Sequence, residues 1–169
     1  MLTDTKVEGN VRDLSTLTKL TALNLSYTKV EGNVKDLSTL TKLTELSLWN
    51  TKVEGDVKDL STLTKLTKLN LTNTNVALND TKVDGDVKDL STLTKLTSLN
   101  LNYTKVEGRT CRRSPSSPSS NVKDLSTLTN IDYLILSGKN VKGNDKDLIM
   151  LTNLAFLHLN GTYYNLGNQ

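Results

Sequence analysis

The chain has 169 residues, a net charge of +3, 36% apolar residues and only 4% aromatic residues. No apolar run approaches 18 residues and the first residues lack a basic and an apolar region, so we expect neither a membrane-spanning helix nor a secretory signal. The single cysteine, Cys111, cannot form an internal disulfide or a cysteine-based metal site. Thirty-two leucines and 25 threonines account for about a third of the chain, and this bias predicts sequence repeats.

The chain is built from units of 23 residues. The third unit carries seven extra residues, 74–80, which look like a partial duplication of a unit junction. The fifth unit is interrupted by residues 109–120, which contain both prolines and several serines, and we expect a disordered surface loop there. We therefore predict one domain over the whole chain, with units at 5–27, 28–50, 51–80, 81–103, 104–138 and 139–161.

Each unit contains two kinds of apolar spacing. Residues 13–20 carry leucine at every third position, which predicts a 3-10 or short helical turn with Asp13 or Ser15 as its N-cap. Leu23 and Leu25 alternate with polar residues, which predicts a short half-buried strand. Since identical units can stack leucine on leucine and pair strand with strand, we predict an α/β solenoid with a parallel sheet on one side.

The pattern Leu20-x-x-Leu23-x-Leu25-x-x-Thr28-x-Val30 recurs along the chain and resembles the leucine-rich repeat, L-x-x-L-x-L-x-x-N-x-L. The flank V-x-G-x-V-x-x-L-x-x-L-T is similar to plant-type repeats, and D-L-S-T-L-T-K-L-T is similar to internalin-type repeats. The resemblance implies a right-handed superhelix with the sheet on its concave face and 3-10, short helical or irregular segments on its convex face. It also implies that Thr28, in place of the family's Asn, bonds the backbone of adjacent units.

Four positions vary widely among the first four units, whereas 16 of the 23 positions are identical. The period of two along a strand turns three of the variable positions away from the core, and the resemblance implies that this concave face binds ligands. Drift after duplication would instead have changed exposed positions such as Thr16 and Lys19, which do not vary. We predict a ligand-binding face formed by Tyr27, Glu45, Ser47, Trp49, Lys68, Asn70, Thr72, Asn100, Asn102, Tyr103, Tyr133, Phe156 and His158.

Trp49 is the expected centre of this face, because it is the only tryptophan and its neighbours across the sheet would be the small residues Ser26 and Thr72. The function expected is non-enzymatic recognition of a protein or peptide, either by this chain alone or as a fragment of a larger receptor or surface protein. No catalytic residue is expected, since His158 has no accompanying nucleophile. We also expect no cofactor, metal ion, nucleic acid or membrane insertion. End-to-end self-association is expected, because both ends lack capping units.

Two other functional interpretations stay open. Recurring exposed threonines, at Thr16, Thr18, Thr21 and their equivalents, are compatible with an ice- or polysaccharide-binding surface, and a decayed array would have no ligand. Rows of lysine are expected to be solvated and relieved by interleaved acidic rows. N-x-[ST] sequences on the proposed face favour a cytoplasmic location, because a glycan would block it, whereas the family resemblance favours an extracellular one if the chain is a fragment.

Overall fold

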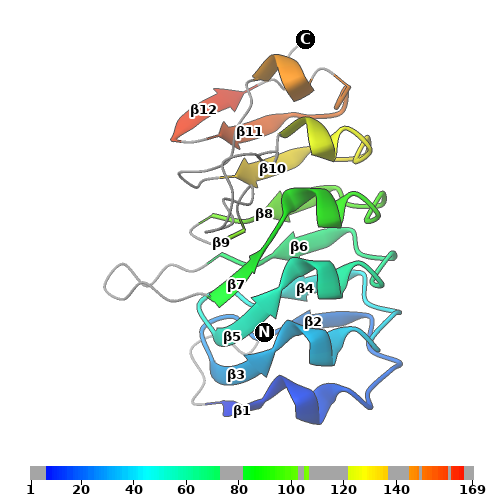
Figure 1. Cartoon of the computed structure of the whole chain (residues 1–169), viewed down its shortest axis with the longest axis vertical. Helices are drawn as coiled ribbons and strands as arrows, with labels where there is room; N and C mark the ends of the chain where they lie inside the picture. Colours follow the sequence, from blue (N-terminus) through cyan, green and yellow to red (C-terminus); the bar gives the residue numbers. More distant parts are fainter. Residues whose placement is uncertain are drawn as a thin grey trace, which may run out of the picture.

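Each 23-residue unit folds into one layer, and the layers stack along the long axis from the blue end to the red end (Figure 1). The structure is a computed structural model that describes residues 7–72, 82–102, 105–106, 122–136, 145–148, 150–159 and 161–165. Residues 74–80, the 109–120 insert and Cys111 therefore lie outside the described residues. The expected solenoid is confirmed: parallel strands alternate with 3-10 helices, and the described parts contain no α-helix.

One side of the stack is a seven-stranded sheet, here called the larger sheet. Its strand order is β12-β11-β10-β8-β6-β4-β2, and every neighbouring pair is parallel except β11 and β12. The predicted alternation at Leu23 and Leu25 lies in its first strand and in the residue that follows it. The strands are β2 (Ala22–Asn24), β4 (Glu45–Ser47), β6 (Lys68–Asn70), β8 (Ser98–Asn100), β10 (Tyr133–Leu136), β11 (Phe156–Leu159) and β12 (Thr162–Asn165).

A second, five-stranded parallel sheet, here called the smaller sheet, was not predicted. It is built from the K-V-E-G-N segment and its equivalents, in the order β1-β3-β5-β7-β9. The strands are β1 (Glu8–Asn10), β3 (Lys29–Asn33), β5 (Lys52–Asp56), β7 (Lys82–Gly85) and β9 (Lys105–Val106). Each of its first four strands leads into a 3-10 helix, so that the first four units each contribute two strands and one helical turn to their layer.

Six 3-10 helices are described, and the first four follow strands of the smaller sheet and begin at an Asn or Asp cap. They are η1 (Val11–Leu14), η2 (Val34–Leu37), η3 (Val57–Leu60), η4 (Val87–Leu90), η5 (Val122–Leu125) and η6 (Asp145–Leu148). The Asn10 side chain accepts a hydrogen bond from the Arg12 N–H at 2.9 Å, and Asn33, Asp56 and Asp86 do the same in their own units. The expected N-caps were therefore wrong: Asp13 lies inside the first turn and Ser15 is the C-cap.

These caps also lie close to a glycine of the next unit. Gly55 has a φ of +121°, and a Cβ built on it would lie 2.5 Å from Asn33 Oδ1 and 2.9 Å from Val34 Cγ2 of the preceding unit. Gly9 has a similar φ of +137°, but nothing lies within 4 Å of its Cβ position. Glycine is therefore required at Gly55 for two reasons, a backbone conformation that L-residues rarely adopt and the close approach of the cap below it.

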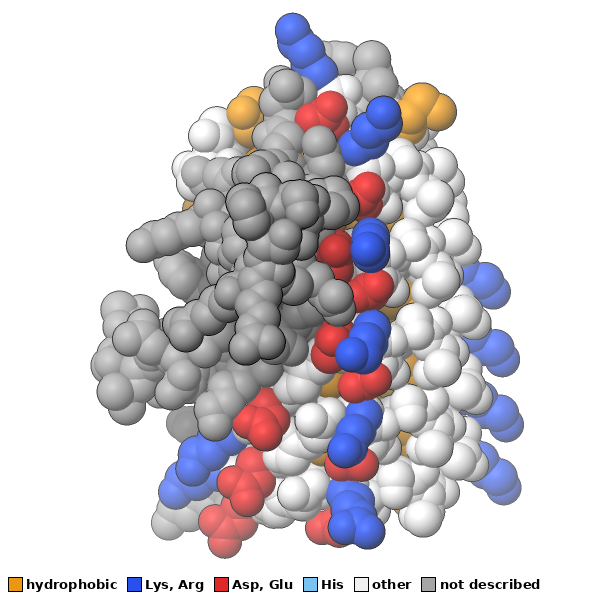
Figure 2. Space-filling model, viewed as in Figure 1, with side chains coloured by type: hydrophobic (Ala, Val, Ile, Leu, Met, Phe, Trp, Pro, Cys, Tyr) orange, Lys and Arg blue, Asp and Glu red, His pale blue; other side chains and the backbone are white. Residues whose placement is uncertain are grey.

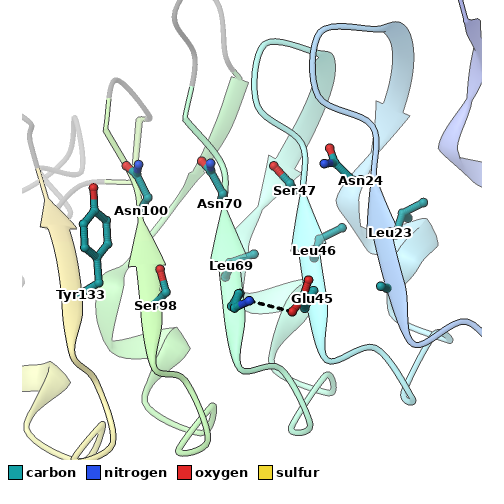
Figure 3. Close-up of a pocket in the computed structure, with 12 residues that line it drawn as sticks. Leu23, Asn24, Glu45, Leu46, Ser47, Leu69, Asn70, Ser98, Asn100 and Tyr133 are labelled. Carbon is teal, nitrogen blue, oxygen red and sulfur yellow. Dashed lines mark ion pairs between the residues drawn. The ribbon is translucent and has the colours of Figure 1, made fainter. Parts of the chain in front are cut away.

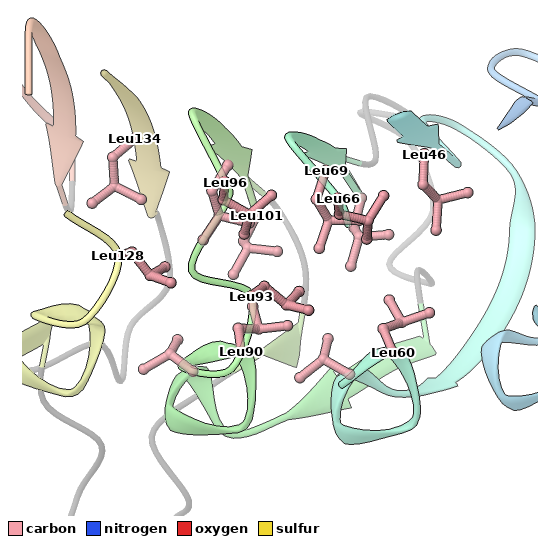
Figure 4. Packing of buried hydrophobic residues seen from close by; sticks show 14 of the residues in the cluster. Leu46, Leu60, Leu66, Leu69, Leu90, Leu93, Leu96, Leu101, Leu128 and Leu134 are labelled. Carbon is pink, nitrogen blue, oxygen red and sulfur yellow. The ribbon is translucent and has the colours of Figure 1, made fainter. Parts of the chain in front are cut away.

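The interior between the two sides is filled almost entirely by leucine and valine. In the second unit Leu37, Leu40 and Leu43 have no exposed area, and Leu46 and Leu48 are 2% exposed. Leucine side chains from the 3-10 helices and from the strands point toward one another across this interior (Figure 4).

Threonine hydroxyls join successive layers. The Oγ1 of Thr39 donates to the Ser15 carbonyl at 2.7 Å, and the Oγ1 of Thr44 donates to the Thr21 carbonyl at 2.9 Å. Thr28 behaves differently from these threonines, because its Oγ1 donates at 2.6 Å to the carbonyl of Leu25, only three residues earlier in the chain, and not to a stacked layer. The position of the family's Asn therefore closes a local turn here.

The C-terminal end of the larger sheet is covered by a hairpin that was not predicted. Strand β12 pairs antiparallel with β11, and Tyr164, opposite Leu157, packs against the leucine core. The C-terminal end, which was expected to lack a cap, is therefore covered at β11. Association of copies through the ends stays a prediction.

Candidate functional site

Two rows of side chains cross the larger sheet on the side away from the core. Register pairs Ala22, Glu45, Lys68 and Ser98 in one row, which continues through Tyr133 and Phe156. The residues between the rows belong to the core and are buried in all but the first unit. The second row consists of Asn24, Ser47, Asn70, Asn100, Ile135 and His158.

A hollow of about 330 Å³ lies over these rows and spans β2, β4, β6, β8 and the start of β10 (Figure 3). Its lining brings together six of the predicted site residues: Glu45, Ser47, Lys68, Asn70, Asn100 and Tyr133. It also includes Ala22, Asn24 and Ser98, which were not in the predicted set although they lie in the same two rows as the predicted residues. The hollow is therefore a trough whose lining is about equally polar and apolar, with leucines among the polar side chains and one aromatic ring at its β10 end.

The asparagines of the trough have one half of each amide engaged. The Oδ1 of Asn24 accepts from the Ser26 N–H, that of Asn70 from the Thr72 N–H and that of Asn100 from the Asn102 N–H, each at 3.0 Å. No partner for their Nδ2 groups exists among the described residues. Since the bonded oxygen fixes each amide, a row of N–H donors remains available along the trough.

The same row has a hydroxyl where the asparagine is missing. Ser47 Oγ lies 2.8 Å from Ser26 Oγ, so these two hydroxyls share a hydrogen bond. Beside it, Lys68 Nζ lies 2.9 Å from Glu45 Oε1 across β4 and β6, with side chains 61% and 50% exposed (Figure 3). An exposed pair of this kind adds little stability, so both charges can meet a ligand at low cost.

Stacked rings close the trough at the C-terminal end of the sheet. The rings of Tyr133 and Phe156 are 4.8 Å apart and nearly parallel, at 11°. His158 is 7% exposed and stacks on Tyr163 of β12, with centroids 4.0 Å apart. Tyr163 was missed from the sequence because it lies beyond the last repeat, although T-Y-Y-N has the β-branched and aromatic composition of a strand. His158 is thus a covered packing residue rather than an open side chain of the face.

Trp49 lies beyond the end of β4 and does not line the trough. Its ring contacts Tyr27, with centroids 4.5 Å apart and planes tilted by 56°, and the side chain is partly buried. The expectation that Trp49 has only small neighbours was therefore wrong, because Tyr27 lies against its ring. The cause is the chain direction: the backbone turns after the strand, and Tyr27 reaches a positive φ of 59°.

The position occupied by Ser26, Trp49, Thr72 and Asn102, one of the four that vary among the first units, also departs from simple strand alternation. Ser26 and Thr72 are each 5% exposed, so their side chains do not lie on the open face. Asn102 is partly exposed at the same position, and Tyr103 lies outside the described residues. The strand alternation therefore holds only as far as the Asn24 position.

Within the described part of the chain, no group of three or more His, Cys, Asp and Glu side chains is placed to hold a metal ion. The described helices also include none with the length and apolar character needed to cross a membrane.

Comparison with solved structures identifies the architecture. The ectodomain of the Arabidopsis receptor kinase HAESA, solved in complex with an N-terminally extended IDA peptide hormone, matches 94% of this chain with 27% identity and a TM-score of 0.70. The chain is a leucine-rich-repeat solenoid. A Listeria monocytogenes internalin, InlF, matches 88% of the chain at 22% identity and a TM-score of 0.63. The plant peptide hormone receptor RGFR1, solved with RGF2, matches 93% at 22% identity and the same TM-score.

The leucine-rich-repeat chain spans only part of these structures: 25% of the HAESA chain, 37% of the InlF chain and 22% of the RGFR1 chain. No sequence-family model matches it, and no curated protein sequence does. The similarity of this chain to the solved structures therefore rests on the fold and the repeat pattern.

Proposed function

We propose that the chain is a non-enzymatic recognition module that binds an extended peptide segment of another protein in the trough of the larger sheet. The observation that supports this most directly is the row of amide donors at Asn24, Asn70 and Asn100, each with its oxygen engaged and its Nδ2 facing the hollow's side of the sheet. A peptide in extended form carries carbonyl acceptors at regular intervals and can satisfy such a row.

The trough also suggests the composition of the segment. The exposed Glu45–Lys68 pair offers one charge of each sign and does not favour a strongly charged ligand. The Tyr133–Phe156 stack at one end offers ring surface to an apolar side chain. The preferred ligand is therefore a largely neutral peptide with an apolar or aromatic anchor that points toward β10.

The comparisons support the same function at the level of the module. The HAESA ectodomain was solved in complex with an N-terminally extended IDA peptide hormone, and the plant peptide hormone receptor RGFR1 was solved in complex with RGF2. A shared fold does not by itself transfer a ligand, so the proposal depends on the trough of this chain.

The test begins with peptides selected from a random library on the full chain. Asn70→Asp keeps the Oδ1 that accepts from Thr72 but replaces the Nδ2 donor by an acceptor. We expect it to weaken the selected peptide at least tenfold in calorimetry with little change in melting temperature. Glu31→Gln, an exposed change on the smaller sheet, is the control and should leave affinity unchanged. Equal affinity of Asn70→Asp and the original chain would refute the proposed site.

The alternative is an ice- or polysaccharide-binding surface made by threonine rows. Hydroxyls of the Thr16 and Thr21 positions donate to the backbone of the preceding unit, as in Thr39 and Thr44, and so serve the fold. The Thr18 position remains exposed in each of the first five units, which is the observation that keeps this alternative. Thermal hysteresis of the purified chain would favour it over peptide recognition.

A further inference from the structure

A row of lysines runs along one edge of the solenoid, away from the trough. The residues occupy the position just before the last core leucine of each turn, and all four are exposed. They are Lys19, Lys42, Lys65 and Lys95. This row is separate from the peptide site proposed above, and neither the fold nor that site uses it.

The lysine row lacks the acidic neighbours that the sequence led us to expect. On the 3-10 helices, each basic residue sits beside an acidic one in the chain, as in Arg12 and Asp13, and Lys58 Nζ is also 2.9 Å from Asp56 Oδ2. In the described parts of the chain, none of the four lysines of the row forms an ion pair. The space-filling view shows both arrangements: a file of alternating red and blue side chains, and an edge where blue side chains project singly (Figure 2).

The geometry concentrates positive charge along a line. Thr44, Thr67 and Thr97 each donate to the carbonyl of the layer before, so the layers that carry the row are stacked at strand spacing. Strand spacing is about 4.8 Å, so four charges span roughly 14 Å. The distance of about 4.8 Å between neighbouring lysine positions is shorter than the Debye length of about 8 Å at physiological salt. The charges therefore repel one another and together attract a polyanion.

The row has a defined end. In the fifth and sixth units the same position is occupied by Asn130 and Asn153. Each Nδ2 donates to a backbone carbonyl of the preceding unit, to Thr94 at 2.9 Å and to Thr129 at 2.8 Å. The position can therefore serve the stack when it is not lysine, and the lysines are not required by the fold.

We propose that the lysine row binds a linear acidic polysaccharide that carries one carboxylate on each sugar. The charges of such a chain recur regularly along its length, so that a row of four lysines can meet several of them together. The exposed threonine that precedes each lysine, such as Thr41 before Lys42, adds a hydroxyl that can bond sugar hydroxyls. Each of the four layers thus offers one cationic group and one hydroxyl group side by side.

Nucleic acid fits the row less well. Single-stranded nucleic acid is held by aromatic side chains that stack on bases, but the described aromatic residues of the lysine-bearing units, Tyr27 and Trp49, lie at the opposite ends of the larger-sheet strands. Bidentate phosphate recognition favours arginine, whereas the row contains only lysine.

The test measures binding of the full chain to polygalacturonate oligosaccharides of defined length, with a neutral galactan and a single-stranded DNA oligomer as comparison ligands. One variant replaces the row by glutamine at Lys19, Lys42, Lys65 and Lys95. The matched control removes the same four charges from the 3-10 helices, as Arg12→Gln, Lys35→Gln, Lys58→Gln and Lys88→Gln. Both variants are checked for unchanged circular dichroism.

We expect the row variant to lose at least tenfold in affinity for polygalacturonate and the control to change less than threefold. Asn130→Lys, which lengthens the row by one charge, should tighten binding and steepen its salt dependence. Absence of polygalacturonate binding, equal losses in the two variants, or tighter binding of the DNA oligomer would each overturn the proposal.

Discussion

Replacing Gly55 by alanine should destabilise the chain far more than the same replacement at Gly9. At Gly55 the φ of +121° imposes backbone strain of about 1–3 kcal/mol on any residue with a Cβ. The new methyl also lies 2.5 Å from Asn33 Oδ1 and 2.9 Å from Val34 Cγ2, and overpacking of this kind costs about 1–3 kcal/mol. The two contributions together predict a loss of about 4 kcal/mol. At Gly9 only the first applies, because its Cβ position is open.

Urea unfolding followed by circular dichroism measures both losses, and a thermal melt should show a decrease of about 10 °C for Gly55→Ala. A double-mutant cycle tests the cause. Asn33→Ala removes the clashing oxygen at the expense of the cap, which is worth about 1 kcal/mol, so Gly55→Ala should cost less in the Asn33→Ala background. Equal losses at Gly55 and Gly9, or strictly additive effects in the cycle, would refute the interlocking of cap and glycine.

Further predictions concern the core, the layer contacts and the aromatic pair. Leu69→Ala should cost about 2–5 kcal/mol of unfolding free energy because the side chain is 1% exposed, whereas Leu17→Ala, at 47% exposed, should cost less than 1 kcal/mol in the same urea titration. Thr62→Val removes a 3.0 Å bond to the Ser38 carbonyl and should cost about 1 kcal/mol, while Thr64→Val should be neutral. Trp49→Ala should lower the melting temperature but leave the affinity for a trough-bound peptide unchanged, and a large loss of affinity would place the ligand at the strand ends instead.

The repeat architecture could be predicted because the residues that build it recur at a fixed spacing. Leu37, Leu40 and Leu43 are buried as the three-residue spacing predicted, and the apolar-polar alternation around Leu46 correctly predicted a strand of the larger sheet. The smaller sheet escaped prediction because its strands contain an internal glycine and expose most of their side chains, as in β3 (Lys29–Asn33), where Val30 is the buried residue. Neither β propensity nor alternation marks such a segment.

The candidate site was predicted less well because periodicity fixes a face but not where a strand ends. Glu45, Lys68 and Asn70 line the trough as neighbours in register. Trp49 lies two residues past the end of β4, where the chain turns and packs the indole on Tyr27. A contact between units at a turn depends on backbone angles that single-sequence spacing does not contain.

In the described part of the chain, the threonine hydroxyls that join the layers all donate in one direction. Thr39, Thr62, Thr92 and Thr127 each donate to a carbonyl that lies earlier in the chain. During synthesis, each unit that leaves the ribosome therefore brings its own donors to acceptors that are already in place. The stack has chemically different ends, so a replacement cap for the first unit must supply acceptors and a cap for the last must supply donors. Because β12 already pairs with β11, head-to-tail fusion of two copies would match donors to acceptors only with β12 removed from the junction, whereas head-to-head fusion matches like groups.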